Sequence, residues 1–311
     1  MNLQQLEYIV AVDVYRHFSK AAEACYITQP TLSMMIQKLE EELGITIFDR
    51  GKQPVIPTEA GGEIIAKARA VLKDCEEIKE LASSLKGELR GELRIGIIPT
   101  VAPYLLPIFL SGFLKKYPKI KVKISELTTD LIVEKLERNL LDVGILATPL
   151  DNPAVLEQPL YKEEFVVYAS TKEKVLNKKY LLAEDINIHH LWLLEEGHCL
   201  RSQILKLCEL KKKDELSTNL EYAAGSIDSL VKMIDQNEGI TILPYLAAIT
   251  LNAKQKKCIR EFKSPVPVRE ISLVTYRHFV KKHILEILKK EIMETVDEYL
   301  SKKRKHEVIP V

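Results

Sequence analysis

The chain has 311 residues, of which 46% are hydrophobic and 29% are charged, and its formal net charge is only +1. This length is enough for about two domains, and the composition is that of a soluble globular protein. Because the overall charge is close to zero, any surface that binds nucleic acid must be local. The N-terminal residues lack the pattern of a signal peptide, and the apolar stretch 240–251 is too short to span a bilayer. We therefore expect a cytoplasmic protein with no membrane partner.

Five cysteines are present, namely Cys25, Cys75, Cys199, Cys208 and Cys258. An odd number of cysteines in a reducing compartment argues against a framework of structural disulfides. No two of them have CxxC spacing, which argues against a zinc ribbon or a thioredoxin-like site, and we expect neither a metal nor a cofactor. A single cysteine is most often a small buried hydrophobic residue, so a reactive role must be indicated by its neighbours.

The first 60 residues contain short stretches with the apolar spacing of helices. Ser19 is the predicted cap of a second helix, and a third helix is predicted over about residues 29–42, with Thr28 as its cap. Two helices joined by a tight turn indicate a helix-turn-helix whose second helix enters the major groove of DNA. The basic stretch 50–54 is a predicted hairpin tip, or wing. Any small helical bundle has similar caps and apolar stripes, so this pattern alone leaves both interpretations open.

The predicted DNA-contacting residues are caps, outward-facing residues of the third helix and two cations of the wing: Ser19, Thr28, Gln29, Pro30, Thr31, Ser33, Met34, Gln37, Lys38, Arg50 and Lys52. Residues 1–60 nevertheless contain five Lys or Arg and eight Asp or Glu, a net charge of −3. Because neutralisation of phosphates supplies much of the affinity for DNA, we expect one isolated domain to bind weakly. Tight binding would then need several linked domains in one oligomer.

A long helix is predicted over residues 59–86, followed by the helix-breaking stretch 87–91. Apolar residues repeat in it at intervals of four and three, which is the spacing of a dimerising coiled coil. We interpret Cys75 as a small residue of this seam and not as half of an intersubunit disulfide. The predicted dimer seam consists of Ile64, Ala68, Val71, Cys75, Ile78, Ala82 and Leu85.

The remainder of the chain alternates between strand-like and helix-like segments. Residues 93–97, 103–116, 121–126, 129–138 and 142–147 have a βαβαβ rhythm. Such alternation predicts an α/β fold with mainly parallel sheets. A second series includes predicted strands at 163–170, 190–195, 219–224 and 240–245, with helices after Cys199 and over 226–236.

The N-terminal segments FSKAAE at 18–23, TQPTLS at 28–33, LEEELG at 39–44, FDR at 48–50 and TEAG at 58–61 resemble the signature of the LysR family. Met35 departs from it, because the family often has glutamine there. The resemblance implies an α/β fold class with an N-terminal winged helix-turn-helix, a long linker helix and a two-lobed regulatory domain that resembles periplasmic solute-binding proteins. The implied boundaries are 1–58, 59–88 and 89–311, with lobe I over about 89–161 and 268–311 and lobe II over about 162–267.

The segment LLEEGHCLR at 193–201 follows a predicted strand and begins a helix. Cys199 therefore lies near a helix N-terminus, where the helix dipole favours a thiolate. His198 and Arg201 add nearby donors or positive charge. An inert buried cysteine would not need this polar neighbourhood, so we predict a reactive thiol.

This segment, with Cys208 nine residues further on, resembles the OxyR group of the LysR family, as do the stretches 98–107 and 239–244. The resemblance covers essentially the whole chain. It implies that hydrogen peroxide oxidises Cys199, which then forms a reversible disulfide with Cys208. It also implies that Thr100, Thr129 and His198 help to place the peroxide and, as a weaker inference, that Arg269 stabilises the thiolate. The implied partners are double-stranded promoter DNA, further copies of the chain in a dimer or tetramer, RNA polymerase, and a thiol reductant such as a glutaredoxin or thioredoxin.

The segment between Cys199 and Cys208 is itself a predicted helix, in which nine residues rise about 13.5 Å. A disulfide needs Cα atoms no more than about 7 Å apart, so this helix would have to unwind before the bond could form. Three alternatives stay open at this point: a LysR regulator of a small organic effector, a thiol peroxidase, and a solute-binding protein. The last lacks an export signal, and a peroxidase gives no reason for the DNA-binding segments, so we expect a regulator and not an enzyme.

Overall fold

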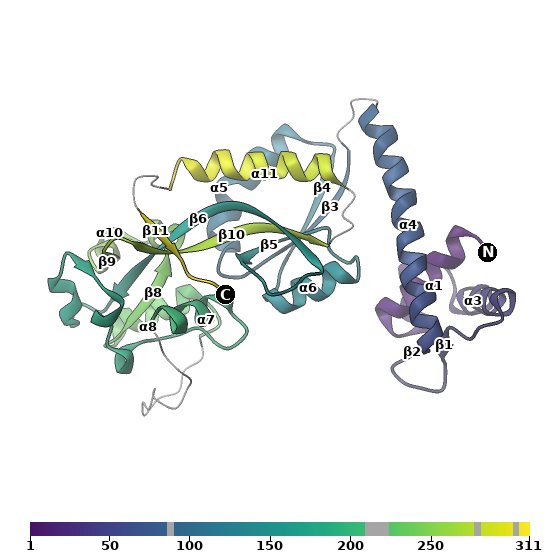
Figure 1. The fold of residues 1–311 in the computed structure, drawn as a ribbon, viewed down its shortest axis with the longest axis horizontal. Coiled ribbons are helices and arrows are strands. Elements are labelled where there is room, and N and C mark those ends of the chain that lie inside the picture. The colour runs from purple at the N-terminus through teal and green to yellow at the C-terminus, as the bar shows by residue number, and fades with distance from the viewer. Residues whose placement is uncertain (86–89, 209–223, 277–280, 301–304) are drawn as a thin grey trace. The chain divides into compact units, whose positions relative to one another are not determined.

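The computed structural model describes residues 1–85, 90–208, 224–276, 281–300 and 305–311 (Figure 1). The chain divides into two compact units, Met1–Glu88 and Leu89–Val311, and each is described by itself. Among the residues so described, no helix has both the length and the apolar character needed to cross a membrane.

The N-terminal unit is a small helical bundle with a two-stranded hairpin. Its apolar core is formed by one face of each of the first four helices, and the residues of the wing hairpin close it. The apolar face predicted for the third helix consists of Leu32, Ile36, Leu39 and Leu43. The first three are fully buried, but Leu43 at the C-terminal end of the helix is 37% exposed, so the prediction is wrong for that residue. The elements are α1 (Leu3–Tyr15), α2 (Phe18–Ala24), α3 (Gln29–Leu43), β1 (Phe48–Asp49), β2 (Ile56–Pro57) and α4 (Glu59–Leu85).

The two predicted helix caps have different outcomes. Thr28 does precede α3, but its hydroxyl lies 2.9 Å from the Thr31 hydroxyl and does not cap the helix. The prediction of Ser19 as the cap of α2 is wrong, since α2 begins at Phe18. The ring Nδ1 of His17 accepts a hydrogen bond from the Ser19 backbone N–H at 3.1 Å and takes the capping role. Histidine is a rare cap, so the sequence favoured the serine.

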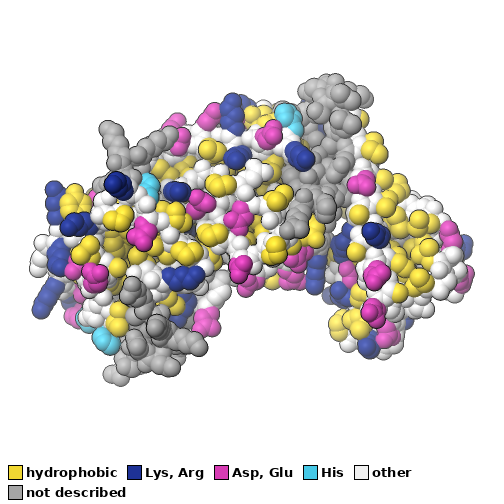
Figure 2. All heavy atoms as spheres, viewed as in Figure 1, with side chains coloured by type: hydrophobic (Ala, Val, Ile, Leu, Met, Phe, Trp, Pro, Cys, Tyr) yellow, Lys and Arg dark blue, Asp and Glu magenta, His cyan; other side chains and the backbone are white. Residues whose placement is uncertain are grey.

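Helix α4 has a buried face in its first half and exposed apolar residues further along. Ala68 is only 2% exposed because it packs into the core of its own chain, which contradicts its assignment to an intermolecular seam. Val71 and Ile78 are 42% and 68% exposed and remain free to contact a second chain. The side chain of Leu85 lies outside the described residues. Figure 2 shows apolar side chains gathered on the visible face of the N-terminal unit.

The C-terminal unit is an α/β structure built on a continuous set of strands in the order β4-β3-β5-β10-β6-β9-β7, with β11 beside β10 and β8 beside β6. The predicted βαβαβ segment is confirmed at 91–148. Its elements are β3 (Gly91–Ile97), α5 (Ala102–Lys116), β4 (Ile120–Glu126), α6 (Thr129–Glu137), β5 (Val143–Thr148), β6 (Val155–Ala169), β7 (Tyr180–Leu181), α7 (Cys199–Leu207), α8 (Ile227–Gln236), β8 (Ile240–Pro244), α9 (Tyr245–Ile249), α10 (Ala253–Lys256), β9 (Ile259–Phe262), β10 (Val266–Tyr276), α11 (Lys282–Asp297) and β11 (His306–Val308), with single 3-10 turns at Lys174–Asn177, Ala183–Asp185 and Ile188–His190.

The expectation of mainly parallel sheets is wrong. Strand β3 is parallel to β4 and β5, but the two long strands β6 and β10 pair antiparallel with each other, and β10 also runs antiparallel to β5. Strand β6 pairs with β10 as far as Glu164 and with β8 from Phe165 onward, so it passes from one sheet to the next. The strands β6 and β10 thus carry the chain from one sheet to the other. The spacing of apolar residues along a strand does not reveal the direction in which it pairs.

The predicted strand at 190–195 is not a regular strand. Only single bridges form there, between Leu191 and Ile240 and between Leu194 and Ala224. The predicted strand at 219–224 falls outside the described residues except for Ala224. The helix predicted at 226–236 is confirmed as α8, with the Ser226 hydroxyl accepting a hydrogen bond from the Ser229 N–H.

Candidate functional site

Most of the predicted DNA-contacting residues are exposed on the N-terminal unit. Ten of the eleven have exposed side chains, and Ser33 is half-buried. Those of α3 lie opposite its buried face, which is the arrangement that a recognition helix requires. We define the recognition surface by the exposed residues of α2, α3 and the wing: Ser19, Thr28, Gln29, Pro30, Thr31, Met34, Gln37, Lys38, Arg50 and Lys52.

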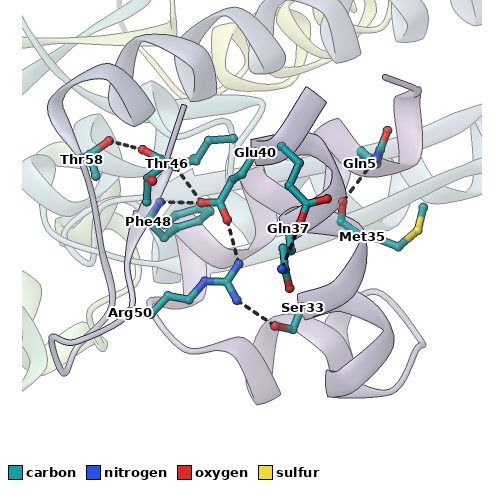
Figure 3. Close-up of polar contacts among 11 residues, drawn as sticks. Gln5, Ser33, Met35, Gln37, Glu40, Thr46, Phe48, Arg50 and Thr58 are labelled. Atoms are coloured by element: carbon teal, nitrogen blue, oxygen red, sulfur yellow. Dashed lines mark hydrogen bonds and ion pairs between the residues drawn. The ribbon is translucent and has the colours of Figure 1, made fainter. Parts of the chain in front are cut away.

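Glu40 connects the recognition helix to the wing (Figure 3). Its Oε1 accepts hydrogen bonds from the backbone N–H groups of Ile47 and Phe48, at 2.7 and 3.2 Å. Its Oε2 accepts one from Arg50 at 2.8 Å, and the same guanidinium donates to the Ser33 hydroxyl at 3.1 Å. The sequence does not reveal this role of Glu40, because nothing near it along the chain marks its partners.

The sequence predicts Arg50 as a free cation of the wing. The structure instead engages its guanidinium with other side chains of the N-terminal unit. Besides Glu40 and Ser33, it lies over the ring of Phe18, with 5.3 Å from its guanidinium carbon to the ring centroid. Lys52 is more loosely placed, 3.8 Å from the Asp49 carboxylate and 62% exposed. Of the two wing cations, Lys52 is the more available to a phosphate, because its pair with Asp49 is long and exposed.

A second cluster surrounds Cys199 in the C-terminal unit. The parallel strands β3 and β5 end at the same edge of their sheet, where ligand sites of α/β folds usually form. Thr100 follows β3, and Thr129 is the first residue of α6. Cys199 is the first residue of α7, after Gly197, whose φ of +92° is one that glycine adopts without strain. We call this cluster the thiol pocket: Thr100, Thr129, Glu163, His198, Cys199 and Arg269.

Burial is the largest influence on the Cys199 thiol and raises its pKa above the ordinary value. The positive charge of Arg269 acts in the opposite direction, followed by the hydroxyl of Thr129 and the backbone of Leu200 and Ala147. The helix N-terminus thus favours the thiolate as expected, but desolvation outweighs it. The Thr129 hydroxyl is buried and, apart from its favourable interaction with the Cys199 sulfur, has no hydrogen-bond partner among the described residues. It is therefore placed to donate to a thiolate or to a ligand bound beside it.

Arg269 is held in place by buried partners. It is 1% exposed, and its guanidinium forms an ion pair with Glu163, which is fully buried, at 2.8 Å. It also donates to the hydroxyl and the carbonyl oxygen of Thr100, at 3.1 Å each. Glu163 in turn accepts the backbone N–H of Leu246 at 2.7 Å. Sequence reasoning missed Glu163, whose only signal is that a charged residue occupies an inward position of an apolar strand.

Two neighbours of Cys199 along the chain behave differently. His198 is buried, and its Nε2 lies 3.6 Å from a Glu195 carboxylate oxygen. The sequence predicts that Arg201 adds a donor or positive charge near the thiol. In the structure Arg201 donates to the carbonyl oxygen of Leu194 at 2.8 Å. This hydrogen bond connects α7 to the segment that precedes it.

Cys208 lies at the other end of α7, where it is the C-cap residue. Both cysteines are free thiols, and the predicted helix between them is present. Burial raises the pKa of the Cys208 thiol to about 11. A helical rise of about 13.5 Å over nine residues keeps the two thiols from bonding in this conformation.

Two family models together match most of the chain. Residues 3–62 match the bacterial regulatory helix-turn-helix protein of the lysR family, and residues 86–288 match the LysR substrate binding domain. The chain belongs to the LysR family of bacterial regulators, as both units indicate.

Within this family the chain is similar to OxyR-like, peroxide-inducible activators. It is 37% identical to the hydrogen peroxide-inducible genes activator of Haemophilus influenzae, over 88% of this chain and 90% of that protein. A full-length OxyR variant of Pseudomonas aeruginosa is 32% identical and has a TM-score of 0.77, with 94% of this chain and 98% of that one covered. An H2O2-bound OxyR mutant of Corynebacterium glutamicum is 30% identical, with a TM-score of 0.62 and coverage of 96% and 95%.

Proposed function

We propose that this chain is a peroxide-responsive regulator that binds promoter DNA through the recognition surface. In this proposal Cys199 is the residue oxidised by hydrogen peroxide, and Cys208 resolves the oxidised form as a disulfide. The observation that carries the proposal is the thiol pocket, a buried cysteine at a helix N-terminus surrounded by donors from distant segments. The similar Corynebacterium protein, whose solved structure is H2O2-bound, supports the choice of ligand.

The pocket offers the groups that the chemistry needs. The Cys199 thiolate attacks one peroxide oxygen, the O–O bond breaks, and the second oxygen leaves as water after taking up a proton, so Cys199 becomes a sulfenic acid. The Thr129 hydroxyl, which faces the Cys199 sulfur, and the Thr100 hydroxyl are suited to bind the peroxide oxygens, and His198 lies beside the thiol along the chain. Arg269 favours the thiolate by its charge.

The second step requires a change of conformation. Helix α7 separates the two sulfurs, so it must unwind before Cys208 can attack the sulfenic acid. While α7 is helical, the Cys208 thiol stays protonated at neutral pH because burial raises its pKa. Unwinding would expose this thiol and so return its pKa toward the ordinary value. A segment with two local folds can move an interface and alter the spacing of DNA-binding units.

The N-terminal unit supports binding as an oligomer. Its net charge of −3 over residues 1–60 and the engagement of Arg50 leave few free cations for phosphates. We propose that residues 1–58 bind DNA, that α4 joins two chains through the exposed Val71 and Ile78, and that residues 89–311 sense the signal. A tetramer, a contact with RNA polymerase and re-reduction by a glutaredoxin or thioredoxin complete the proposal.

One experiment decides the central point. Mass spectrometry after one equivalent of peroxide should find a disulfide between Cys199 and Cys208 in the wild type. Cys199→Ser should abolish both the disulfide and the peroxide-dependent change in promoter binding, and Cys208→Ser should accumulate the Cys199 sulfenic acid. Cys258→Ser is the matched control, because Cys258 is also buried but lies outside the thiol pocket.

The same variants separate the alternatives. A regulator of a small organic effector would keep its induction in Cys199→Ser. A thiol peroxidase would show sustained turnover of peroxide with a thiol reductant, without any effect on promoter binding. Either result would replace the proposed function.

A further inference from the structure

The last described segment of the chain, residues 305–311, lies beside helix α7 (Figure 1). Its strand β11 pairs in parallel with the first residues of β10. Directly after β11, the Ile309 backbone N–H donates to the carbonyl oxygen of Val268 at 2.8 Å, and the Ile309 side chain is buried. The segment is thus anchored to the sheet that also carries Arg269.

Two side chains of α7 reach this anchored segment. Gln203 is fully buried, and its Nε2 donates to the carbonyl oxygen of Ile309 at 2.8 Å. Lys206 donates from its Nζ to the backbone oxygen of Val311. Gln203 lies one helical turn after Cys199, and Lys206 lies two residues before Cys208. The two bonds therefore span the part of the helix that must unwind for a disulfide to form.

The buried amide of Gln203 is only half satisfied. Its Oε1 is buried and has no hydrogen-bond partner among the described residues. Burial of an unpaired carbonyl oxygen costs free energy, which weakens the helical conformation of this turn. The bond from the other half of the amide to Ile309 opposes that cost. The helical state of α7 consequently depends on contacts with residues 305–311.

We propose that residues 305–311 form a clasp that holds α7 helical and slows the approach of Cys208 to oxidised Cys199, with Gln203 and Lys206 as its positioning residues. The clasp rests on the proposed function, since it acts on the disulfide step. In that step the Cys208 sulfur attacks the sulfur of the Cys199 sulfenic acid. The S–S bond forms, the S–O bond breaks, and the hydroxide leaves as water with the proton of Cys208. Hydrogen peroxide, the oxidant, has already accepted two electrons in forming the sulfenic acid.

The test compares Gln203→Ala and Lys206→Ala with Ser202→Ala in the full-length protein. Ser202 is exposed on the same helix and makes no described contact with the clasp. Hydrogen exchange of the α7 amides is measured in the thiol form. Quenched mass spectrometry after one equivalent of peroxide then gives the rates of sulfenic acid and disulfide formation separately.

Loss of its hydrogen bond should speed α7 exchange and disulfide formation about fivefold in Lys206→Ala. The increase should be smaller in Gln203→Ala, because this change also removes the unpaired Oε1. The rate of sulfenic acid formation at Cys199 should stay unchanged, which a general loss of structure would not allow. Lys206→Ala changes a side chain exposed to solvent, so it keeps the test decisive if Gln203→Ala does not fold.

The two possible failures are distinguishable. If the wild type forms a disulfide but both clasp variants match Ser202→Ala in exchange and disulfide rate, the clasp is overturned and the proposed function stands. If the wild type forms no disulfide with peroxide, the proposed function is wrong and the clasp has no step to control.

Discussion

Each unit contains a glutamate that binds an arginine, and the two pairs differ in their surroundings. Glu40 and Arg50 lie near the recognition surface, with side chains 12% and 39% exposed. Glu163 and Arg269 are 0% and 1% exposed, and the charge of Arg269 acts on the Cys199 thiol. Water solvates the first pair and screens its attraction, whereas the second pair has only protein partners.

The difference in burial goes with a difference in the role of the carboxylate. In the N-terminal unit the carboxylate mainly orders backbone, since it accepts the N–H groups of Ile47 and Phe48. In the C-terminal unit the carboxylate neutralises and orients a buried cation that favours the Cys199 thiolate. Exposed pairs contribute little to stability, while loss of one partner of a buried pair leaves a charge that nothing solvates.

Removal of the buried carboxylate should have the largest effect. Glu163→Leu leaves the Arg269 guanidinium buried without its counter-charge, and we expect a loss of about 3–5 kcal/mol in the free energy of unfolding. Urea denaturation measures it. The double variant Glu163→Leu with Arg269→Met should recover most of the loss. A single variant within about 1 kcal/mol of the wild type would contradict the burial of this pair.

Glu40→Ala should have the next largest effect. It leaves two backbone N–H groups and the Arg50 guanidinium without their acceptor, so we expect a loss of about 1–3 kcal/mol in unfolding of the N-terminal unit. The neighbouring Glu41→Ala is the control, because Glu41 is exposed and its carboxylate accepts from the Gln37 side chain and from no backbone N–H of the described residues. Equal free energies of unfolding in the two variants would show that the backbone contacts of Glu40 do not stabilise the N-terminal unit.

Thr129→Val tests the electrostatics of the thiol pocket with almost no change of volume. The hydroxyl favours the Cys199 thiolate, so its removal should raise the pKa of Cys199 further. Less thiolate at neutral pH means slower alkylation of Cys199, and the pH profile of the rate should move to higher pH. Mass spectrometry at Cys199 follows this reaction. Thr128→Val at the preceding residue should leave the profile in place, and a downward movement in Thr129→Val would contradict the assignment.

Arg50→Met should have the smallest effect on stability. The pair with Glu40 is partly exposed, so we expect a loss of no more than about 1 kcal/mol, which should shrink at high salt. Urea denaturation at two ionic strengths measures both. Operator binding should respond differently from stability. We expect Lys52→Met to reduce the salt dependence of the affinity for operator DNA more than Arg50→Met does. A larger effect of Arg50→Met on that slope would show that Arg50 leaves Glu40 to meet a phosphate.

Much of the fold could be predicted because its signals are local. The apolar spacing of α3 and the alternation over residues 91–148 describe single elements, and both were found. Strand direction depends on partners far along the chain, so the antiparallel return of β6 and β10 was missed. The segment 190–195 has the composition of a strand but makes only single bridges.

The candidate sites show the same limit. Cys199 was singled out by its place at a predicted helix N-terminus, and Thr100, Thr129 and Arg269 by resemblance. The structure brings Arg269 into contact with Thr100, and both Arg269 and Thr129 act on the Cys199 thiol. Their net effect on the thiol was not predictable, because burial depends on packing from several elements. Glu40 and Glu163 were missed since the partners of each are distant in sequence or belong to the backbone. Ala68 was assigned to a seam because a heptad pattern does not say which chain covers it.

In the proposed dimer, helix α4 would link folding to association. Ala68 on its first half belongs to the core of the N-terminal unit, while Val71 and Ile78 lie exposed further along the same helix. A second chain that covers Val71 and Ile78 binds only the folded unit, so it stabilises that unit by mass action. The melting temperature of the N-terminal unit should then rise with protein concentration. Dilution would then lower the affinity for DNA in two ways, because fewer N-terminal units would be folded and fewer would be paired.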